Sequence, residues 1–219
     1  MKKIPTVFVR EFSGHKITAI KPEFTSKEVE EAFLFGTPTL KVDGAACMLK
    51  DGKLYRRFDF GKAKKVPVDR PVIFCQEKPD EITGHFPAWL LCSHSDPADK
   101  WFFKAYEHYF SEWEPTAQFP SLNGTYEAIG PHFQGNPYHL EEDTLHRHGS
   151  IELDGYFPLD DAHREVLRIV GELPNKQYVH SFEGVKEFLK DNCCEGIVYW
   201  YKGKPVCKIK RTDFGFKWP

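Results

Sequence analysis

The chain lacks a charge excess of either sign. Its 219 residues contain 30 lysines and arginines against 32 aspartates and glutamates. A strongly basic chain would indicate broad electrostatic binding to nucleic acid, so any polynucleotide contact here has to come from local basic patches. No stretch of the sequence approaches the ~20 consecutive apolar residues that a membrane-spanning helix needs. The sequence therefore predicts a protein without a membrane partner and without a general affinity for polyanions.

Paired cysteine motifs are missing as well. The six cysteines include no pair with C-x-x-C spacing, which argues against a zinc ribbon and against a dithiol redox motif. The first residues, Met1–Glu11, contain no apolar run like that of a secretory signal peptide. We therefore expect a reduced, soluble, cytoplasmic protein.

Hydrophobic periodicity and turn residues divide the chain into interleaved strands and helices. We expect strands at 6–10, 39–42, 45–50, 53–58, 72–75, 125–129, 151–157, 197–201 and 206–211. We expect helices at 99–113, 161–170 and 181–190, and one that opens on a Thr25/Glu28 capping box and ends near Gly36. Asp51-Gly52 is typical of a type I′ hairpin turn, and 59–71 and 131–149 are predicted loops. The irregular spacing favours an α+β fold with mainly antiparallel sheets.

Lys41-Val42-Asp43-Gly44 follows a predicted strand and is the first of an ordered set of motifs. A lysine near its reference pKa of ~10.4 is almost fully protonated at neutral pH and cannot attack phosphorus. Burial and neighbouring cations lower that pKa and free the lone pair. Lys41 is therefore the candidate nucleophile for attaching a nucleotide to the protein itself.

Two segments near the C-terminus supply groups that would serve this lysine. Lys208 and Lys210 lie two apart on a predicted strand, so both side chains point to one face, where they would bind phosphate oxygens. A solvated strand face is the alternative. Glu195 precedes the apolar run Gly196–Val198 and would hold Mg²⁺ beside a triphosphate, or else be an ordinary strand-end acid.

Polar residues in the middle of the chain are less specific. Glu127 alternates with apolar neighbours and would accept ribose hydroxyl groups or bind metal, and an edge salt bridge fits the local sequence equally well. Arg57 ends the hairpin after the lysine motif and would reach the sugar or a phosphate, or form a cross-strand charge pair. His146 and His148 have metal-ligand spacing, but we favour solvated loop histidines.

In this order the motifs resemble motifs I, Ia, III, IV and V of the covalent nucleotidyltransferases, the superfamily of DNA ligases, RNA ligases and mRNA capping enzymes. The residues that carry the resemblance are Lys41–Gly44, Arg57, Glu127, Glu195–Val198 and Lys208–Lys210. The chain is similar in particular to the small ATP-dependent 5′-to-3′ RNA ligases, the family of the vertebrate RNA ligase. This narrower likeness rests on Gly84–Trp89, Glu127–Gly130, Gly135–Tyr138, His148-Gly149 and Phe214–Pro219.

The resemblance implies a nucleotidyltransferase fold in which two antiparallel sheets flank the ATP pocket. It implies one catalytic domain over residues 1–219 without a C-terminal OB domain. Lysine attacks ATP to give lysyl-AMP, AMP moves to an RNA 5′-phosphate, and an RNA 3′-hydroxyl then expels AMP. ATP and Mg²⁺ or Mn²⁺ are the implied cofactors, and the implied partner is RNA with 5′-phosphate and 3′-hydroxyl ends, as in RNA repair.

The resemblance also assigns residues to ligands. The implied ATP-binding residues are Leu40, Lys41, Arg57, Glu127, Ile151, Glu195, Lys208 and Lys210. Leu40 would offer backbone groups to the adenine, and Ile151 stands where many ligases stack an aromatic ring on the base. Glu195 and Glu127 would hold the metal. The basic residues that would follow the RNA backbone, unless they are a solvated charge run, are Arg56, Lys62, Lys64 and Lys65.

Other functions stay open at this point. A capping-type guanylyltransferase would use GTP in place of ATP, and a minimal DNA ligase would seal DNA. Both typically need a further OB domain, so the expected domain organisation favours RNA ligation. A catalytically silent module that binds RNA ends or nucleotides is the non-enzymatic alternative, and the retention of the three motif lysines and Glu195 argues against it.

Overall fold

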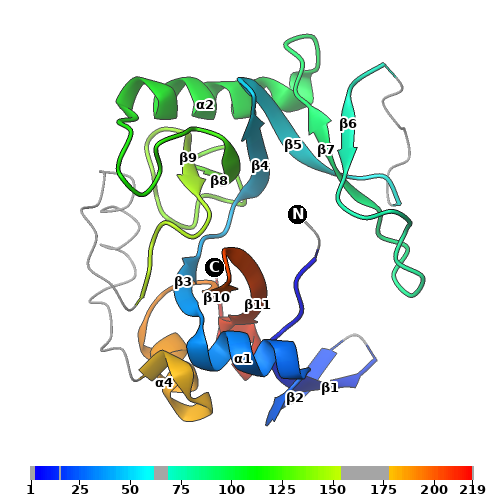
Figure 1. The fold of residues 1–219 in the computed structure, drawn as a ribbon, viewed down its shortest axis with the longest axis vertical. Coiled ribbons are helices and arrows are strands. Elements are labelled where there is room, and N and C mark those ends of the chain that lie inside the picture. The colour runs from blue at the N-terminus through cyan, green and yellow to red at the C-terminus, as the bar shows by residue number, and fades with distance from the viewer. Residues whose placement is uncertain (1–2, 15, 62–68, 154–177, 219) are drawn as a thin grey trace. The chain divides into compact units, whose positions relative to one another are not determined.

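The structure is a computed structural model that describes residues 3–14, 16–61, 69–153 and 178–218. It is α+β with mainly antiparallel strands, which confirms the predicted fold class (Figure 1). The chain divides into two compact units. Unit 1 consists of Met1–Lys3 and Asp43–His148, and unit 2 of Ile4–Val42 and Gly149–Pro219. Within the described ranges, no helix is both long enough and apolar enough to cross a membrane.

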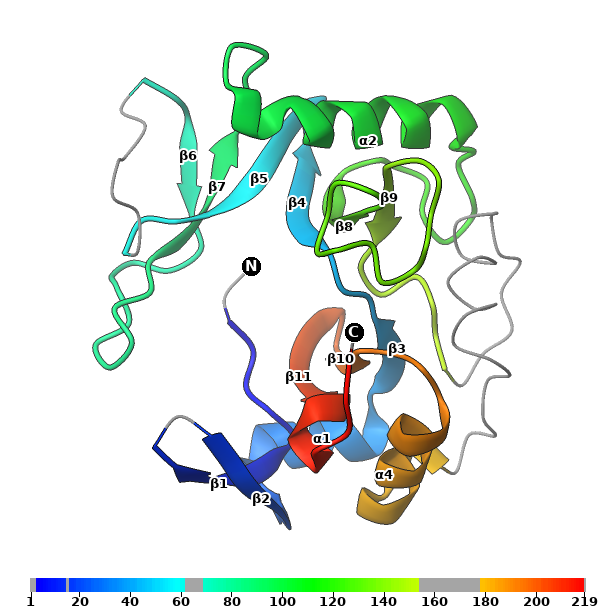
Figure 2. The same ribbon diagram turned by 180° about the vertical axis from the view of Figure 1, so that it is seen from behind.

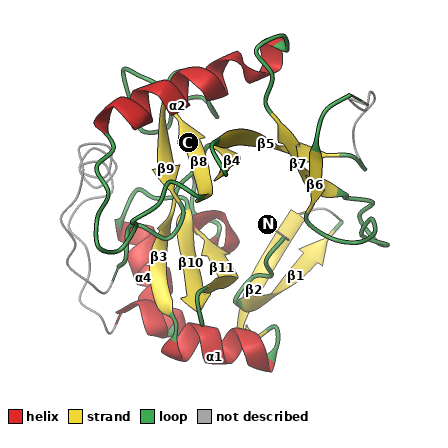
Figure 3. Ribbon diagram, turned by 45° about the horizontal axis from the view of Figure 1, so that its top comes forward, coloured by secondary structure: helices red, strands yellow, loops and turns green. Residues whose placement is uncertain are grey.

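Unit 1 is built on a six-stranded antiparallel sheet with the strand order β6-β7-β5-β4-β8-β9. Its strands are β4 (Ala45–Lys50), β5 (Lys53–Asp59), β6 (Val72–Phe74), β7 (Pro87–Leu91), β8 (Gly124–Ile129) and β9 (Thr144–Arg147). The helix α2 (Lys100–Glu112) follows a short 3-10 helix, η1 (Pro97–Asp99). Figure 3 shows α2 along the sheet, where it contacts β9, β8 and β5.

Alternation along the strands of unit 1 separates a buried face from a polar one. The helix α2 buries Ala105 and Tyr109 against the sheet, and the Tyr109 and Tyr126 rings lie 5.5 Å apart. Cys47 on β4 and Leu54 on β5 are buried in the same cluster. Because successive side chains on a strand point to opposite faces, the residues that alternate with these project from the other side of the sheet.

Unit 2 contains a three-stranded antiparallel sheet with the order β11-β10-β3. Its strands are β3 (Thr37–Lys41), β10 (Gly196–Tyr201) and β11 (Lys204–Lys210). An antiparallel bridge from Glu152 to Thr39 extends one edge, and a parallel bridge from Thr6 to Lys208 extends the other. The other elements are β1 (Phe8–Ser13), β2 (Lys16–Phe24), α1 (Lys27–Phe35), η2 (Tyr178–His180), α4 (Phe182–Asp191) and η3 (Arg211–Phe214).

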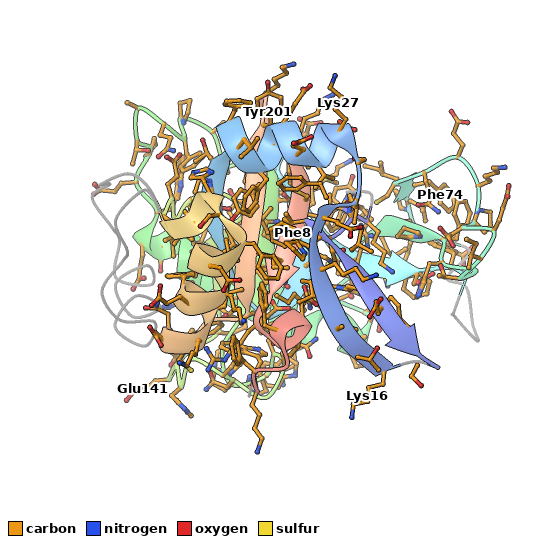
Figure 4. All side chains as sticks on the ribbon, turned by 90° about the horizontal axis from the view of Figure 1, so that it is seen from below. Phe8, Lys16, Lys27, Phe74, Glu141 and Tyr201 are labelled. Atoms are coloured by element: carbon orange, nitrogen blue, oxygen red, sulfur yellow. The ribbon has the colours of Figure 1, made fainter. Side chains whose placement is uncertain are left out.

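One face of the unit 2 sheet is covered by helices. Leu40, Ile197 and Ile209 lie side by side on the three strands, and all are at most 5% exposed. The helix α1 packs on β10 and β11. Phe8, labelled in Figure 4, contacts aromatic rings from β2, α1 and α4. In Figure 2 the red C-terminal turn is η3, which lies beside α4 and β2.

The two hairpins with glycine turns follow the sequence closely. Asp51 and Gly52 have φ angles of 51° and 71°, as a type I′ turn requires, and Lys202 and Gly203 have φ angles of 51° and 73°. The strand over 45–50 begins and ends where we predicted. Only part of the predicted strand 151–157 can be compared, because 154–157 lie outside the described residues, as does the predicted helix 161–170.

Two local predictions were wrong, and two strands were missed. The N-cap of α1 is Ser26, whose hydroxyl accepts the Val29 N–H, while the Thr25 hydroxyl donates to the Thr6 carbonyl. The predicted loop 131–149 contains β9, because Leu145 is buried in the core of unit 1. Strands β2 and β7 were not predicted; β7 begins at a proline, which is tolerated at the first residue of a strand.

Candidate active site

The second face of the unit 2 sheet carries the predicted phosphate-binding lysines. Lys41 on β3 and Lys210 on β11 both stand directly opposite Gly196 on β10. Lys208 stands opposite Val198 in the next row on the same face. We call this surface, with Lys41, Lys208 and Lys210, the lysine face. The period of two along β11 thus separates its lysines from buried Ile209, as the sequence predicted.

Glu195 is the counter-charge at one end of the lysine face. Its side chain is 5% exposed, and its two oxygens accept hydrogen bonds from Lys41 Nζ and from Lys210 Nζ, the latter at 2.5 Å. An isolated buried carboxylate would lose several kcal/mol of solvation, an order-of-magnitude figure, and two ammonium groups offset this cost. The three groups carry one net positive charge, and Lys208 raises the charge of the face further. The arrangement can therefore bind an anion.

Glycines allow two close backbone approaches around the motifs. A Cβ atom at Gly196 would lie 2.2 Å from the Ile209 carbonyl oxygen, so a larger residue would push β11 away from β10. A Cβ atom at Gly44 would lie 2.2 Å from the Ala128 carbonyl oxygen. The Asp43 N–H donates to the Tyr138 hydroxyl at 2.7 Å. Asp43 and Gly44, the last two residues of the motif, therefore serve the packing of unit 1.

Unit 1 brings two other predicted residues onto one face of its sheet. Cys47 pairs with Arg56 and Ala46 with Glu127, so the side chains of Arg57 and Glu127 project from the same face, on either side of Ala46. The guanidinium of Arg57 lies 5.3 Å from the centroid of the Trp89 ring, and its Nη1 donates to Cys75 Sγ at 3.2 Å. We call this row, Arg57–Ala46–Glu127, the Glu127 row.

Glu127 has a partner that the sequence did not reveal. Its Oε2 lies 2.7 Å from His148 Nε2, and His148 Nδ1 lies 3.0 Å from Thr125 Oγ1. Our prediction of solvated loop histidines was wrong: His146 belongs to β9 and is 2% exposed, while the His148 side chain is 17% exposed. The strand pairing of β8 with β9 brings this histidine to the carboxylate. A strand assigned to 144–147 in the sequence would have indicated that His148 can reach Glu127.

The side chains of Leu40 and Ile151 project from the face of the sheet opposite the lysines. The Leu40 N–H donates to the Ile151 carbonyl at 2.8 Å. Because Glu152 pairs with Thr39, the side chain of Ile151 projects from the same face as Leu40, toward the helices. Ile151 is 2% exposed. Its position favours a role in the core of unit 2 over base stacking.

The basic residues proposed for RNA divide into two groups. Arg56 donates to Asp99 at 2.5 Å, and Asp99, whose side chain is fully buried, also binds Arg70. Asp96 accepts from Arg70 at 2.6 Å. These contacts make Arg56 part of a buried ion-pair network in unit 1. Lys62, Lys64 and Lys65 lie outside the described residues.

The carboxylates present suit a metal only in combination with a substrate. Across the ranges that the structure describes, no three His, Cys, Asp or Glu side chains gather to form a metal site. Mg²⁺ commonly binds through one or two carboxylates and completes its shell with phosphate oxygens and water. Glu195 could supply one such carboxylate beside a bound triphosphate, and a metal there would share its oxygens with Lys41 and Lys210. The adjacent Cys194 stays a protonated thiol at neutral pH, because burial raises its pKa to about 12.

The comparisons with known proteins add no assignment. No protein-family model matches the chain, and no curated protein matches it.

Proposed function

We propose that this protein is an ATP-dependent RNA ligase that forms a covalent AMP adduct on Lys41. The observation that supports this best is the Glu195 carboxylate shared between Lys41 and Lys210. It joins the candidate nucleophile, a second cation and a candidate metal ligand at one end of the lysine face. A solvated strand face would not bury a carboxylate between two of its lysines. The order of the motifs along the sequence supports the same nucleotidyltransferase assignment.

In the proposed first step, Lys41 Nζ attacks the α-phosphate of ATP. A P–N bond forms, the bond to pyrophosphate breaks, and the ammonium proton of Lys41 has to leave before the attack. Glu195 accepts a hydrogen bond from this ammonium group and would accept that proton. Lys208 and Lys210 would bind the phosphate oxygens. Mg²⁺ held by Glu195 and the triphosphate would neutralise the charge that develops on the phosphates.

In the second step, an oxygen of the RNA 5′-phosphate attacks the α-phosphate of the adduct. The P–N bond breaks, and Lys41 recovers its amine as AMP moves to the RNA. The 3′-hydroxyl of the second RNA end then attacks the adenylylated 5′-phosphate, forms the phosphodiester and expels AMP. Lys208 and Lys210 remain available in every step to bind phosphate oxygens, so the lysine face can serve all three reactions.

The Glu127 row of unit 1 carries the two residues that the resemblance assigns to the sugar of the nucleotide. Glu127 offers a hydrogen-bond acceptor to ribose hydroxyl groups, and Arg57 offers donors to the sugar or a phosphate. Ala46 between them has only a methyl group, so it adds little bulk to this row. Ile151 is left out of the proposed contacts because it is buried among apolar residues.

The proposal is tested by incubating the protein with α-labelled ATP or GTP and separating the product on a denaturing gel. Label from ATP should stay on the protein and be lost in acid, as a phosphoramidate is. Lys41→Ala and Lys41→Arg should abolish it, since neither offers a nucleophilic amine at neutral pH. Lys50→Ala, at the exposed end of β4, is the control and should label like the unmodified protein.

Strand sealing then separates the ligase classes. Matched RNA and DNA strands with a 5′-phosphate and a 3′-hydroxyl are offered with ATP in the same tube. Sealing of RNA is expected. Equal or better sealing of nicked DNA would make the protein a minimal DNA ligase, labelling by GTP alone would make it a capping-type enzyme, and persistent labelling of both Lys41 variants would remove the assignment of the nucleophile.

A further inference from the structure

Arg211 follows β11 directly and binds the segment that leads into Glu195. Its guanidinium Nη1 donates to the carbonyl oxygens of Leu189, Lys190 and Asn192, with the bond to Asn192 at 2.7 Å. These carbonyls belong to the last turn and C-cap of α4. The last carbonyls of a helix have no partner within the helix and carry partial negative charge, so a guanidinium is a favourable cap.

The backbone of Arg211 holds Glu195 itself. The Arg211 N–H donates to the Glu195 carbonyl at 2.9 Å. Asn192 stands three residues before Glu195, and its carbonyl accepts both from Arg211 and from the Cys194 N–H, the latter at 3.0 Å. Cys194, between these points, is 1% exposed. Arg211 therefore fixes the short connection from α4 to β10 at both of its ends.

Asp213, also in η3, fixes Lys210 through its carboxylate. Asp213 Oδ2 accepts the Lys210 N–H at 2.8 Å, and its other oxygen accepts from Arg10 on β1. The Asp213 side chain is 1% exposed. The turn η3 thus binds both members of the Glu195–Lys210 ion pair. Arg211 contacts the segment that leads into Glu195, and Asp213 contacts Lys210.

We propose that Arg211 is a positioning residue for Glu195, which it holds against Lys41 and Lys210 through the carbonyls of the α4 C-terminus. The catalytic consequence of this role rests on the proposed function. Arg211 would then set the Mg²⁺ concentration that lysyl-AMP formation needs, without contacting the nucleotide or the metal. Groups that orient a metal ligand commonly change metal affinity about 10–100-fold when they are removed.

The matched control is Arg147 in unit 1. It binds the carbonyls of Ser121 and Asn123 at 2.9 and 2.8 Å, so it is also a guanidinium that caps backbone oxygens. Its removal should weaken the fold of unit 1 in a comparable way without loosening the Glu195 segment. The variants to compare are Arg211→Ala, Arg211→Lys and Arg147→Ala, all assayed well below their unfolding temperatures.

The first measurement is a Mg²⁺ titration of Lys41 labelling by ATP. Arg211→Ala should raise the half-saturating Mg²⁺ concentration by about tenfold or more, and labelling should recover toward the unmodified rate at high Mg²⁺. Added methylguanidinium should restore part of the Mg²⁺ response of Arg211→Ala and have no effect on Arg147→Ala. Arg211→Lys keeps a cation but cannot bridge several carbonyls, so it should lie between the two.

The second measurement needs no activity. An amine-acylating reagent is applied without ATP, and mass spectrometry compares modification of Lys41 with that of exposed Lys202. Arg211→Ala should raise Lys41 modification several-fold toward the value of Glu195→Gln, because the carboxylate no longer holds the ammonium group. Arg211→Lys provides the same test if Arg211→Ala does not fold.

The outcomes separate the two ideas. Unmodified protein that forms no lysyl-AMP would remove the proposed function, and the acylation experiment would then decide the positioning role alone. Arg211 variants whose Mg²⁺ response and Lys41 modification match those of Arg147→Ala would overturn the positioning role while leaving the ligase proposal standing.

Discussion

Lys41 and Lys210 stand opposite the same residue, Gly196, from the two strands that flank β10. Neighbouring strands lie about 4.8 Å apart, so the backbones of the two lysines are separated by roughly 10 Å across a residue that has no side chain. Glu195 connects their ammonium groups. The Glu127 row of unit 1 repeats this pattern, with Arg57 and Glu127 on either side of Ala46. In both units, charged groups flank a residue with a small side chain or none.

The first prediction concerns the charge of Glu195. Glu195→Gln and Glu195→Ala should reduce lysyl-AMP formation by ~10²-fold or more, as expected when a preorganised charged group is removed from a transition state. Rates are measured with labelled ATP at limiting Mg²⁺, and circular dichroism checks the fold. Glu183→Gln, an exposed acid in the first turn of α4, is the control. Unchanged rates in the Glu195 variants would identify an ordinary structural acid.

The second prediction concerns the small residue of the Glu127 row. Ala46→Leu should raise the KM for ATP strongly while leaving the unfolding temperature close to that of the unmodified protein, because Ala46 is only partly buried. Added bulk one row away on the same face, as in Met48→Phe, should affect the KM much less. If both variants bind ATP equally well, Ala46 does not border the nucleotide.

The third prediction concerns the Glu127–His148 pair. Both Glu127→Gln and His148→Ala should weaken ATP binding, and the double variant should lose less than the sum of the two. The expected coupling free energy is about 0.5–3 kcal/mol for groups in direct contact. ATP affinity of the four proteins is measured by calorimetry. Strict additivity would show that the histidine does not act through the carboxylate.

The fourth prediction separates the basic residues. Arg56→Ala removes one of the two cations of buried Asp99, which keeps Arg70, and should cost about 1–3 kcal/mol of stability. Replacing Lys62, Lys64 and Lys65 together by alanine should instead raise the KM for RNA and flatten its salt dependence by roughly 0.7 log units per lost contact. Chemical denaturation and sealing assays at several salt concentrations measure the two effects. RNA binding that is unchanged in the triple variant would remove these lysines from the substrate site.

The fifth prediction concerns pH. Burial raises the pKa of Cys92, Cys194 and Cys207 to about 12. The unfolded chain releases these thiol protons near pH ~8.5, so above that value the folded state binds more protons than the unfolded state. The contribution of these thiols to stability should therefore be constant below the unfolded thiol pKa and decrease as pH rises toward 12. Unfolding by urea between pH 7 and 10 measures this, and Cys194→Ala should reduce the slope.

The sequence by itself determined the features that depend on neighbouring residues. The turn Asp51-Gly52 requires positive φ angles that aspartate and glycine tolerate, so the β4–β5 hairpin could be predicted from a few residues. The alternation of Lys208, Ile209 and Lys210 likewise determined which side chains of β11 would share a face, because a strand has a period of two wherever it pairs. The lysine face could therefore be predicted in part.

Only the tertiary structure decided which distant groups meet. Lys41 and Glu195 are 154 positions apart, and their contact depends on β3 and β10 pairing in one particular register. The pairing of β8 with β9 likewise brought His148 to Glu127. The edge bridge next to β3 turned Ile151 toward the apolar core. A change of register by one residue would reverse each of these orientations, and register is set by packing over the whole sheet, which a short stretch of sequence does not specify.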